Sequence, residues 1–251
     1  QNYTEAFKFY KQAADQGYVS AQVIIAGLYF EGRGVDQDYA KAFKYYKLAA
    51  DQGHAAAQCH LGFLYKEGKG VDQDYTKAIR YYVSAAEKGE SFAQIDLGYL
   101  YASGDGVHQN VNKALKYYKM AADQGELAAH KSLFIMYVEG KLIKKNYKEA
   151  FYHAKFAANQ GDSESLSNLG YCYEKGVGVE VDFKKSLKYY KMSSEKGSAL
   201  GMFNMGDAYK NGRGVKKDLK KALSWFTKSE KNGEKEASIE IKNILKELDN
   251  D

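Results

Sequence analysis

The sequence predicts an all-α protein, a solenoid of stacked 36-residue helix-turn-helix repeats. Two observations lead to this prediction. Proline is absent from all 251 residues, although ordinary usage of about 5% would supply roughly a dozen. Glycine recurs at a constant step of 36 residues, at Gly17, Gly53, Gly89, Gly125, Gly161, Gly197 and Gly233.

Other positions keep the same step. Twelve residues after each of the first six glycines stands a tyrosine: Tyr29, Tyr65, Tyr101, Tyr137, Tyr173 and Tyr209. Three residues further on stands a second glycine: Gly32, Gly68, Gly104, Gly140, Gly176 and Gly212. Several columns in one register are typical of a repeat protein, in which neighbouring repeats bury a continuous core.

The first half of each repeat has the pattern of a helix with one buried face. In the second repeat, its apolar or small residues are Ala57, Leu61, Gly62, Leu64 and Tyr65. This is the 3.6-residue periodicity of an amphipathic helix. We expect the helix to end at Gly68, in a left-handed C-terminal cap.

The second half of each repeat predicts another helix. An Asp or Asn precedes each one and is a favoured N-cap: Asp38, Asp74, Asn110, Asn146, Asp182 and Asp218. The buried face that follows in the second repeat consists of Tyr75, Ala78, Ile79, Tyr82, Ala85 and Ala86. Gly68 and Gly70 therefore lie between two helices and recur, which favours a structural turn over a phosphate-binding loop.

The period divides the chain into one array. We expect residues 1–17 to be the second helix of a truncated repeat and residues 234–251 to be a C-terminal capping helix. The six full repeats between them are 18–53, 54–89, 90–125, 126–161, 162–197 and 198–233.

The consensus AQxxLGxLYxxGxGVxxDYxKAxxYYxxAADQG resembles the Sel1-like repeat, a relative of the tetratricopeptide repeat. The residues that carry the resemblance include Ala57-Gln58, Leu61-Gly62, Leu64-Tyr65, Gly68, Gly70-Val71, Asp74-Tyr75, Lys77-Ala78, Tyr81-Tyr82, Ala85-Ala86 and Gly89. The resemblance covers essentially the whole chain. It implies a right-handed α/α superhelix that acts as a non-enzymatic scaffold or adaptor for a partner protein or peptide.

The resemblance also bears on the cellular location of the protein and on alternative functions. Bacterial members are often envelope or secreted proteins that interact with host cells, so a periplasmic or secreted location is favoured over the cytoplasm or the endoplasmic reticulum. A cysteine-rich branch has been linked to penicillin binding, which leaves a β-lactamase-like enzyme as an alternative. This chain lacks the paired cysteines of that branch, because it has only Cys59 and Cys172. A regulatory subunit that activates a membrane enzyme through a lysine-rich face is a further alternative.

The fourth repeat departs from the consensus. Phe134 replaces the glycine of Leu-Gly, and Ala154 replaces the second tyrosine of Tyr-Tyr. A large residue enters where another large residue is lost, which conserves core volume. We therefore predict that the glycine column packs against the second tyrosine column in the other repeats.

A helical wheel places the variable positions of the first helices on the arc opposite the buried face. By analogy with tetratricopeptide arrays, this arc lines a concave surface. Its aromatic and polar side chains are typical of a surface that binds a peptide or a partner helix. The predicted partner-binding residues are His60, Phe63, Phe92, Ile95, Asp96, Tyr99, Lys131, Ile135, Asn168, Tyr171, Phe203 and Asn204.

No catalytic or metal-binding constellation occurs in the sequence, and we expect no cofactor. None of the five histidines has a zinc-ligand spacing. The net charge of +5 is mild and its lysines alternate with acids, so we expect no nucleic-acid partner. No apolar run approaches the ~18 residues of a transmembrane helix, and we expect a monomer.

Overall fold

The structure is a computed structural model that describes residues 3–249, and no strand occurs in that range. Each of its helices has 13 residues. The first helices of the repeats are α2 (Val19–Glu31), α4 (Ala55–Glu67), α6 (Ser91–Ser103), α8 (Leu127–Glu139), α10 (Ser163–Lys175), α12 (Ala199–Asn211) and α14 (Ala237–Asp249). The second helices are α1 (Tyr3–Asp15), α3 (Tyr39–Asp51), α5 (Tyr75–Glu87), α7 (Val111–Asp123), α9 (Tyr147–Asn159), α11 (Phe183–Glu195) and α13 (Leu219–Lys231).

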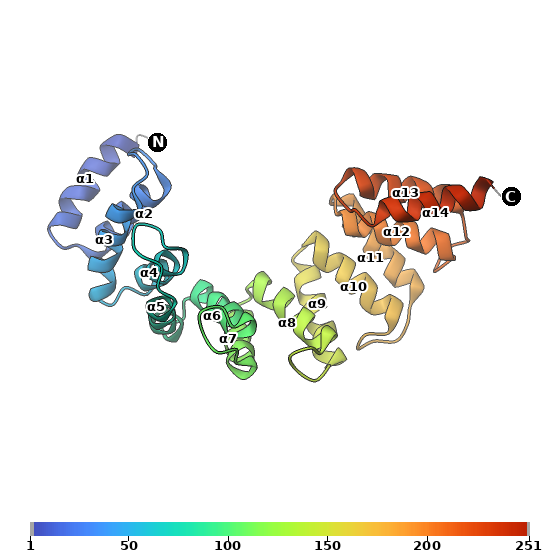
Figure 1. Cartoon of the computed structure of the whole chain (residues 1–251), viewed down its shortest axis with the longest axis horizontal. Helices are drawn as coiled ribbons and strands as arrows, with labels where there is room; N and C mark the ends of the chain where they lie inside the picture. Colours follow the sequence, from blue (N-terminus) through green and yellow to red (C-terminus); the bar gives the residue numbers. More distant parts are fainter. Residues whose placement is uncertain (1–2, 250–251) are drawn as a thin grey trace. The chain divides into compact units, whose positions relative to one another are not determined.

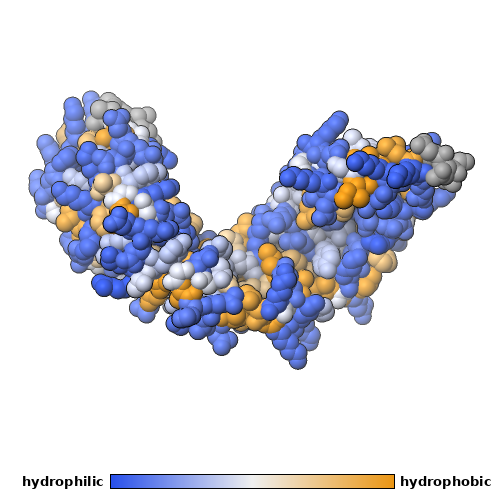
Figure 2. Space-filling view, viewed as in Figure 1, coloured by the Kyte–Doolittle hydropathy of each residue, from blue (hydrophilic) through white to orange (hydrophobic). Residues whose placement is uncertain are grey.

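The chain divides into two compact halves, an N-terminal half (Gln1–Glu126) and a C-terminal half (Leu127–Asp251). Within each half, a helix packs mainly on the helices that precede and follow it in the sequence (Figure 1). Successive first helices also meet, α4 with α6 and α10 with α12. The predicted all-α repeat solenoid is confirmed. Hydrophilic side chains cover most of the visible face of each half (Figure 2).

Both predicted kinds of helix end are confirmed. The side-chain oxygen of each predicted N-cap accepts a hydrogen bond from the backbone N–H three residues later, at 2.9–3.3 Å. The first helices α2, α4, α6, α10 and α12 end at a glycine in the left-handed conformation, with φ between 65° and 85°. A residue with a Cβ is strained there. These local signals mark the start of the second helices α3, α5, α7, α9, α11 and α13 and the end of most first helices.

The two helices of a repeat approach each other through a glycine and an aromatic ring. A Cβ added to Gly62 would lie 2.7 Å from a ring carbon of Tyr82, closer than any real Cβ contact. The same holds for the pairs Gly98–Tyr118, Gly170–Tyr190 and Gly206–Phe226, at 2.6, 2.6 and 2.9 Å. The predicted packing of the glycine column against the second tyrosine column is therefore confirmed.

The fourth repeat reaches the same buried volume in another way. Phe134 and Ala154, which occupy the positions of the glycine and the ring, are 6% and 1% exposed. A buried pair of histidines accompanies this exchange, with the Nδ1 atoms of His130 and His153 2.8 Å apart. Since the contact joins two ring nitrogens, one of them must carry the N–H that donates the hydrogen bond, and the other must accept it.

Most tyrosines belong to the scaffold. The first-helix tyrosines Tyr29, Tyr65, Tyr101 and Tyr173 stack on Tyr45, Tyr81, Tyr117 and Tyr189, with ring centroids 5.7–6.1 Å apart. In the fourth repeat, Tyr137 stacks on His153 in the same way, at 6.0 Å. Such pairs add to the stability that comes from area burial alone. Packing therefore accounts for these rings.

Several lysines of the second helices have partners within their own repeat. Lys41, Lys77, Lys113, Lys185 and Lys221 lie over the rings of Tyr29, Tyr65, Tyr101, Tyr173 and Tyr209, with the ammonium 4.8–5.5 Å from the centroid. Four of them also form ion pairs with the N-cap aspartates, at 3.0–3.5 Å. Much of the positive charge near the start of these helices is thus balanced locally.

Ala154→Tyr should lower the free energy of unfolding by about 1–3 kcal/mol, because a ring would enter a site already filled by Phe134. Adding Phe134→Gly recreates the glycine and tyrosine of the other repeats and should recover part of the loss. Urea denaturation of the two variants measures both effects. If the variant with Ala154→Tyr alone were as stable as the wild type, the packing of Phe134 against position 154 would be contradicted.

Asn110→Ala should lower the free energy of unfolding by about 1 kcal/mol, because α7 loses the oxygen that caps its first turn. In the wild type this oxygen accepts from the Lys113 N–H at 3.0 Å. Asn110→Asp keeps an oxygen in place and serves as the matched control. Hydrogen exchange at the start of α7 should rise in the alanine variant alone.

Candidate functional site

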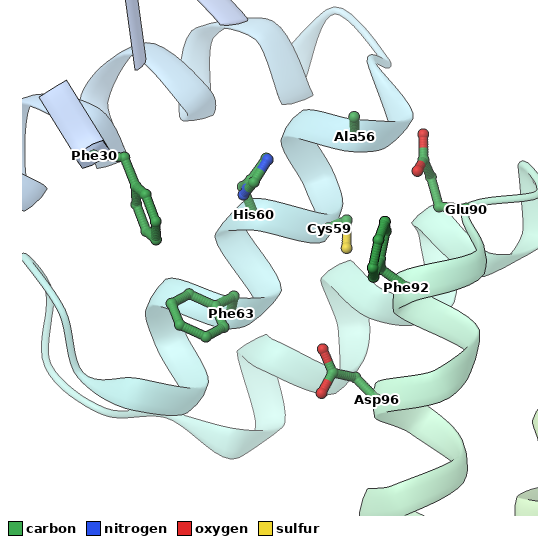
Figure 3. Close-up of a pocket in the computed structure, with 8 residues that line it drawn as sticks. All are labelled: Phe30, Ala56, Cys59, His60, Phe63, Glu90, Phe92 and Asp96. Carbon is green, nitrogen blue, oxygen red and sulfur yellow. The ribbon is translucent and has the colours of Figure 1, made fainter. Parts of the chain in front are cut away.

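A pocket of about 500 Å³ opens beside the first helices of the N-terminal half. Its volume lies within the range of about 300–1,000 Å³ that is usual for ligand sites. Eight residues line it: Phe30, Ala56, Cys59, His60, Phe63, Glu90, Phe92 and Asp96 (Figure 3). They come from the C-terminal end of α2, from α4, and from α6 with the residue before it.

The α4 residues in the pocket belong to one arc of that helix. Ala56, Cys59, His60 and Phe63 are spaced by three, one and three residues, so they share a face. The opposite face carries Leu61, which is fully buried. The packing that buries one face of α4 thereby turns the variable face toward the pocket.

Aromatic contacts hold one wall of the pocket. The ring of Phe30 lies 5.8 Å from that of Phe63 and 5.9 Å from that of His60. His60 also stacks on Tyr46, at 4.5 Å between centroids. Burial lowers the pKa of His60, because a charged imidazolium is disfavoured away from water. At neutral pH His60 is therefore an uncharged part of this wall.

Two carboxylates lie on the α6 side of the pocket. Asp96 pairs with Lys66 at 3.1 Å, and Lys66 also contacts Glu67 at 3.3 Å. Glu90, the N-cap of α6, makes no side-chain capping bond. Among the residues that the structure describes, its carboxylate has no hydrogen bond or ion pair. The pocket thus combines an apolar lining with excess negative charge.

Cys59 lies between the aromatic wall and the carboxylates (Figure 3). Burial, together with the charges of Asp96 and Glu90, raises the pKa of Cys59 to about 12. The thiol is consequently protonated at neutral pH, and a thiol is a far weaker nucleophile than a thiolate. Cys59 acts here as an apolar lining residue.

A buried hydroxyl lies close to this acidic side. Tyr82, whose ring packs on Gly62, is fully buried, and its hydroxyl has no hydrogen-bond partner in the part of the chain described. Burial raises the pKa of Tyr82, and the negative charge of Asp96 raises it further. Tyr82 is therefore a neutral phenol at neutral pH, and it does not line the pocket.

Four of the predicted partner-binding residues meet in this pocket: His60, Phe63, Phe92 and Asp96. The predicted set did not include the other four lining residues, Phe30, Ala56, Cys59 and Glu90. Phe30 lies on the corresponding arc of the preceding first helix, so the same wheel could have identified it. Glu90 lies just outside its helix, where a helical wheel gives no orientation.

Two more predicted residues lie on α6 outside the pocket. Tyr99 is 53% exposed and borders a neighbouring depression with Lys66, Tyr75 and Asp105. A hydrogen bond to Asp105 raises the pKa of Tyr99. Ile95 is half-buried. Their part in binding stays a prediction.

The remaining predicted residues belong to the C-terminal half. Ile135 and Tyr171 are exposed, whereas Asn168 and Asn204 are half-buried. Lys131 forms ion pairs with Glu164 and Asp162, so its charge is already balanced. Phe203 packs edge-on against the buried ring of Phe226, at 5.1 Å. These six residues do not contribute to the pocket described above.

The pH dependence of Cys59 alkylation tests the electrostatics of the pocket. With a pKa of about 12, Cys59 should react with iodoacetamide at pH 8 about a thousandfold more slowly than free cysteine, and about tenfold faster for each added pH unit. Asp96→Asn should speed the reaction, since it removes a charge that opposes the thiolate.

Peptide mapping by mass spectrometry separates Cys59 from Cys172, which is fully buried. Glu87→Gln, a change to an exposed carboxylate outside the pocket, serves as the control. Rapid labelling of Cys59 in the wild type at pH 7 would contradict the raised pKa.

The chain is similar to several solved structures. It is 33% identical to c5321, a protective antigen present in uropathogenic Escherichia coli strains that displays an SLR fold; the match has a TM-score of 0.88 and covers 95% of this chain and 51% of that one. The chain thus spans about half the length of c5321. A Sel1 repeat protein from Oxalobacter formigenes is 34% identical, with a TM-score of 0.77, over 91% of this chain and 94% of that one. Yeast Tom70 shares only the fold, with 15% identity and a TM-score of 0.50 over 98% of this chain and 52% of that one.

No protein of curated function matches this sequence. In contrast, the model of the Sel1 repeat matches residues 1–18, 19–54, 55–90, 91–126, 127–162, 163–198 and 199–234. These seven matches run without a gap and cover most of the chain. The chain therefore belongs to the Sel1 repeat family.

Proposed function

We propose that this protein is a non-enzymatic scaffold that binds a segment of a partner protein along the first helices of its N-terminal half. The pocket between Phe30 and Asp96 is the anchor for that segment. The observation that carries the proposal is the contrast between the two arcs of α4 and α6. One arc repeats the packing residues of every repeat, whereas the other presents an apolar pocket with charged groups at its edge.

The exposure of two rings on α6 supports the proposal. Phe92 and Tyr99 are 68% and 53% exposed and are seven residues apart, so they lie on one side of the helix. Exposed aromatic rings beside a pocket are typical anchors of protein interfaces. The Sel1 repeat fold itself is typical of protein–protein interaction.

The similarity to c5321 supports a more specific setting. That protein is a protective antigen of uropathogenic Escherichia coli, and an antigen is a protein that the host encounters. We extend the proposal accordingly to a bacterial envelope or secreted protein that binds a host protein. Surface labelling of intact producing cells tests the location.

Affinity capture with paired variants tests the binding site. Phe92→Ala with Tyr99→Ala removes both exposed rings of α6 and should reduce captured partner at least tenfold. The matched control is Phe9→Ala with Tyr18→Ala, which removes rings that are 71% and 64% exposed elsewhere in the same half. Both variants should melt like the wild type, because exposed rings contribute little to stability.

A partner that is retained by the α6 variant and by the control alike would refute the proposed site. A partner lost from both variants would show that binding depends on exposed apolar surface in general. Only selective loss from the α6 variant supports the proposal.

A further inference from the structure

An acidic residue stands immediately before the first helix in three successive repeats, and its partners differ. Glu126 accepts a hydrogen bond from Ser91 at 2.6 Å. Asp162 caps its own helix at Ser165, 2.8 Å away, and contacts Lys131. Glu90 has no such partner among the described residues. A carboxylate left unpaired at the edge of an apolar pocket is available to a positively charged ligand.

The exposed ring next to Glu90 lacks a partner as well. Phe92 is 68% exposed, and within residues 3–249 it contacts neither another ring nor a cation. Phe63, across the pocket, already has Lys66 and Lys69 near its face, at 5.6 and 5.3 Å. The unpartnered ring of Phe92 therefore lies on the α6 side of the pocket, as does the unpartnered carboxylate of Glu90.

The charged residues that line the pocket favour a cation, because both are carboxylates, whereas the ammonium groups of Lys66 and Lys69 lie over Phe63 on the other wall. Glu90 and Asp96 lie toward opposite ends of the α6 side, with Phe92 between them (Figure 3). Lys66 is the nearest ammonium to Asp96, but it is shared with Glu67. The raised pKa of Cys59 is partly due to both Asp96 and Glu90, so both charges act inside the pocket.

This combination occurs once in the sequence. An acid just before the first helix, an aromatic residue two positions later and a second acid four positions after that are found only at Glu90, Phe92 and Asp96. The corresponding positions of the next repeat carry Glu126, Ala128 and Ser132. The arrangement is therefore not a requirement of the fold.

We infer that the pocket takes an arginine side chain of the partner segment, with its stem and guanidinium on Phe92 and its charge paired with Glu90. This inference rests on the proposed scaffold function and names the residue recognised. A purely apolar side chain in the same place would desolvate the Glu90 carboxylate without pairing it, which costs free energy. A planar guanidinium both stacks on a ring and bonds a carboxylate, which a lysine ammonium does less well.

Two peptides that differ only in charge test the inference. Acetyl-Gly-Leu-Arg-Leu-Gly-amide is compared with the same peptide carrying citrulline, which keeps the shape of arginine but is neutral. Titrations followed by 1H–15N NMR report binding through the amide signals of Cys59, Phe92 and Asp96. The arginine peptide should bind about fivefold more tightly, as expected for one partly exposed ion pair. The preference should shrink at high salt.

Paired variants locate the preference. Glu90→Gln should abolish the difference between the two peptides, whereas Glu87→Gln, an exposed carboxylate of the same half outside the pocket, should leave it intact. Phe92→Ala should weaken binding of both peptides. Equal binding of the two peptides, binding of neither, or a preference that survives Glu90→Gln would each overturn the inference.

The peptide titrations and the affinity capture test the arginine inference and the scaffold proposal separately. If the α6 double variant loses its captured partner while the peptides show no arginine preference, the scaffold proposal stands and the inference about arginine fails. If capture does not depend on Phe92 and Tyr99 but the arginine preference is observed, the pocket recognises arginine and the proposed partner site is wrong.

Discussion

The close approach of two helices in each hairpin is the contact on which the rest of this structure depends. A glycine on the first helix lets an aromatic ring of the second lie where a Cβ would otherwise stand, as at Gly62 and Tyr82. The two helices approach each other equally closely in each repeat that has this glycine and ring. The fourth repeat fills the volume with Phe134 and Ala154 instead, so the constraint concerns volume and not residue identity.

Such an array can carry a function because most of its packing uses one side of each first helix. An N-cap bounds α5 and a glycine C-cap bounds α4, both 13 residues long, and successive first helices present the same arc to their surroundings. Many positions on that arc are not required for packing and differ from repeat to repeat, although some, such as His60 and Phe203, also contact core rings. In the N-terminal half these differences bring three phenylalanines and two carboxylates together around one pocket.

Much of the fold could be predicted from the sequence, because its signals are local. Caps, helix faces and the pairing of Gly62 with Tyr82 all depend on residues within one repeat. The candidate site was harder to predict from the sequence, since it depends on how neighbouring repeats pack on each other. The helical wheel identified Phe63 and Phe92, but Glu90 lies outside any helix. It also could not show that Phe203 packs against a core ring, because that contact depends on side-chain rotamers.

Contacts between sequence neighbours dominate both halves, and this locality has a consequence for engineering and evolution. The pocket is encoded by one continuous stretch, residues 30–96, and not by segments scattered along the chain. Such a stretch is a cassette: exchanged as whole repeats, it would carry its recognition chemistry into another array with the same glycine and tyrosine columns. Duplication of the cassette would multiply binding sites while leaving every existing helix contact intact.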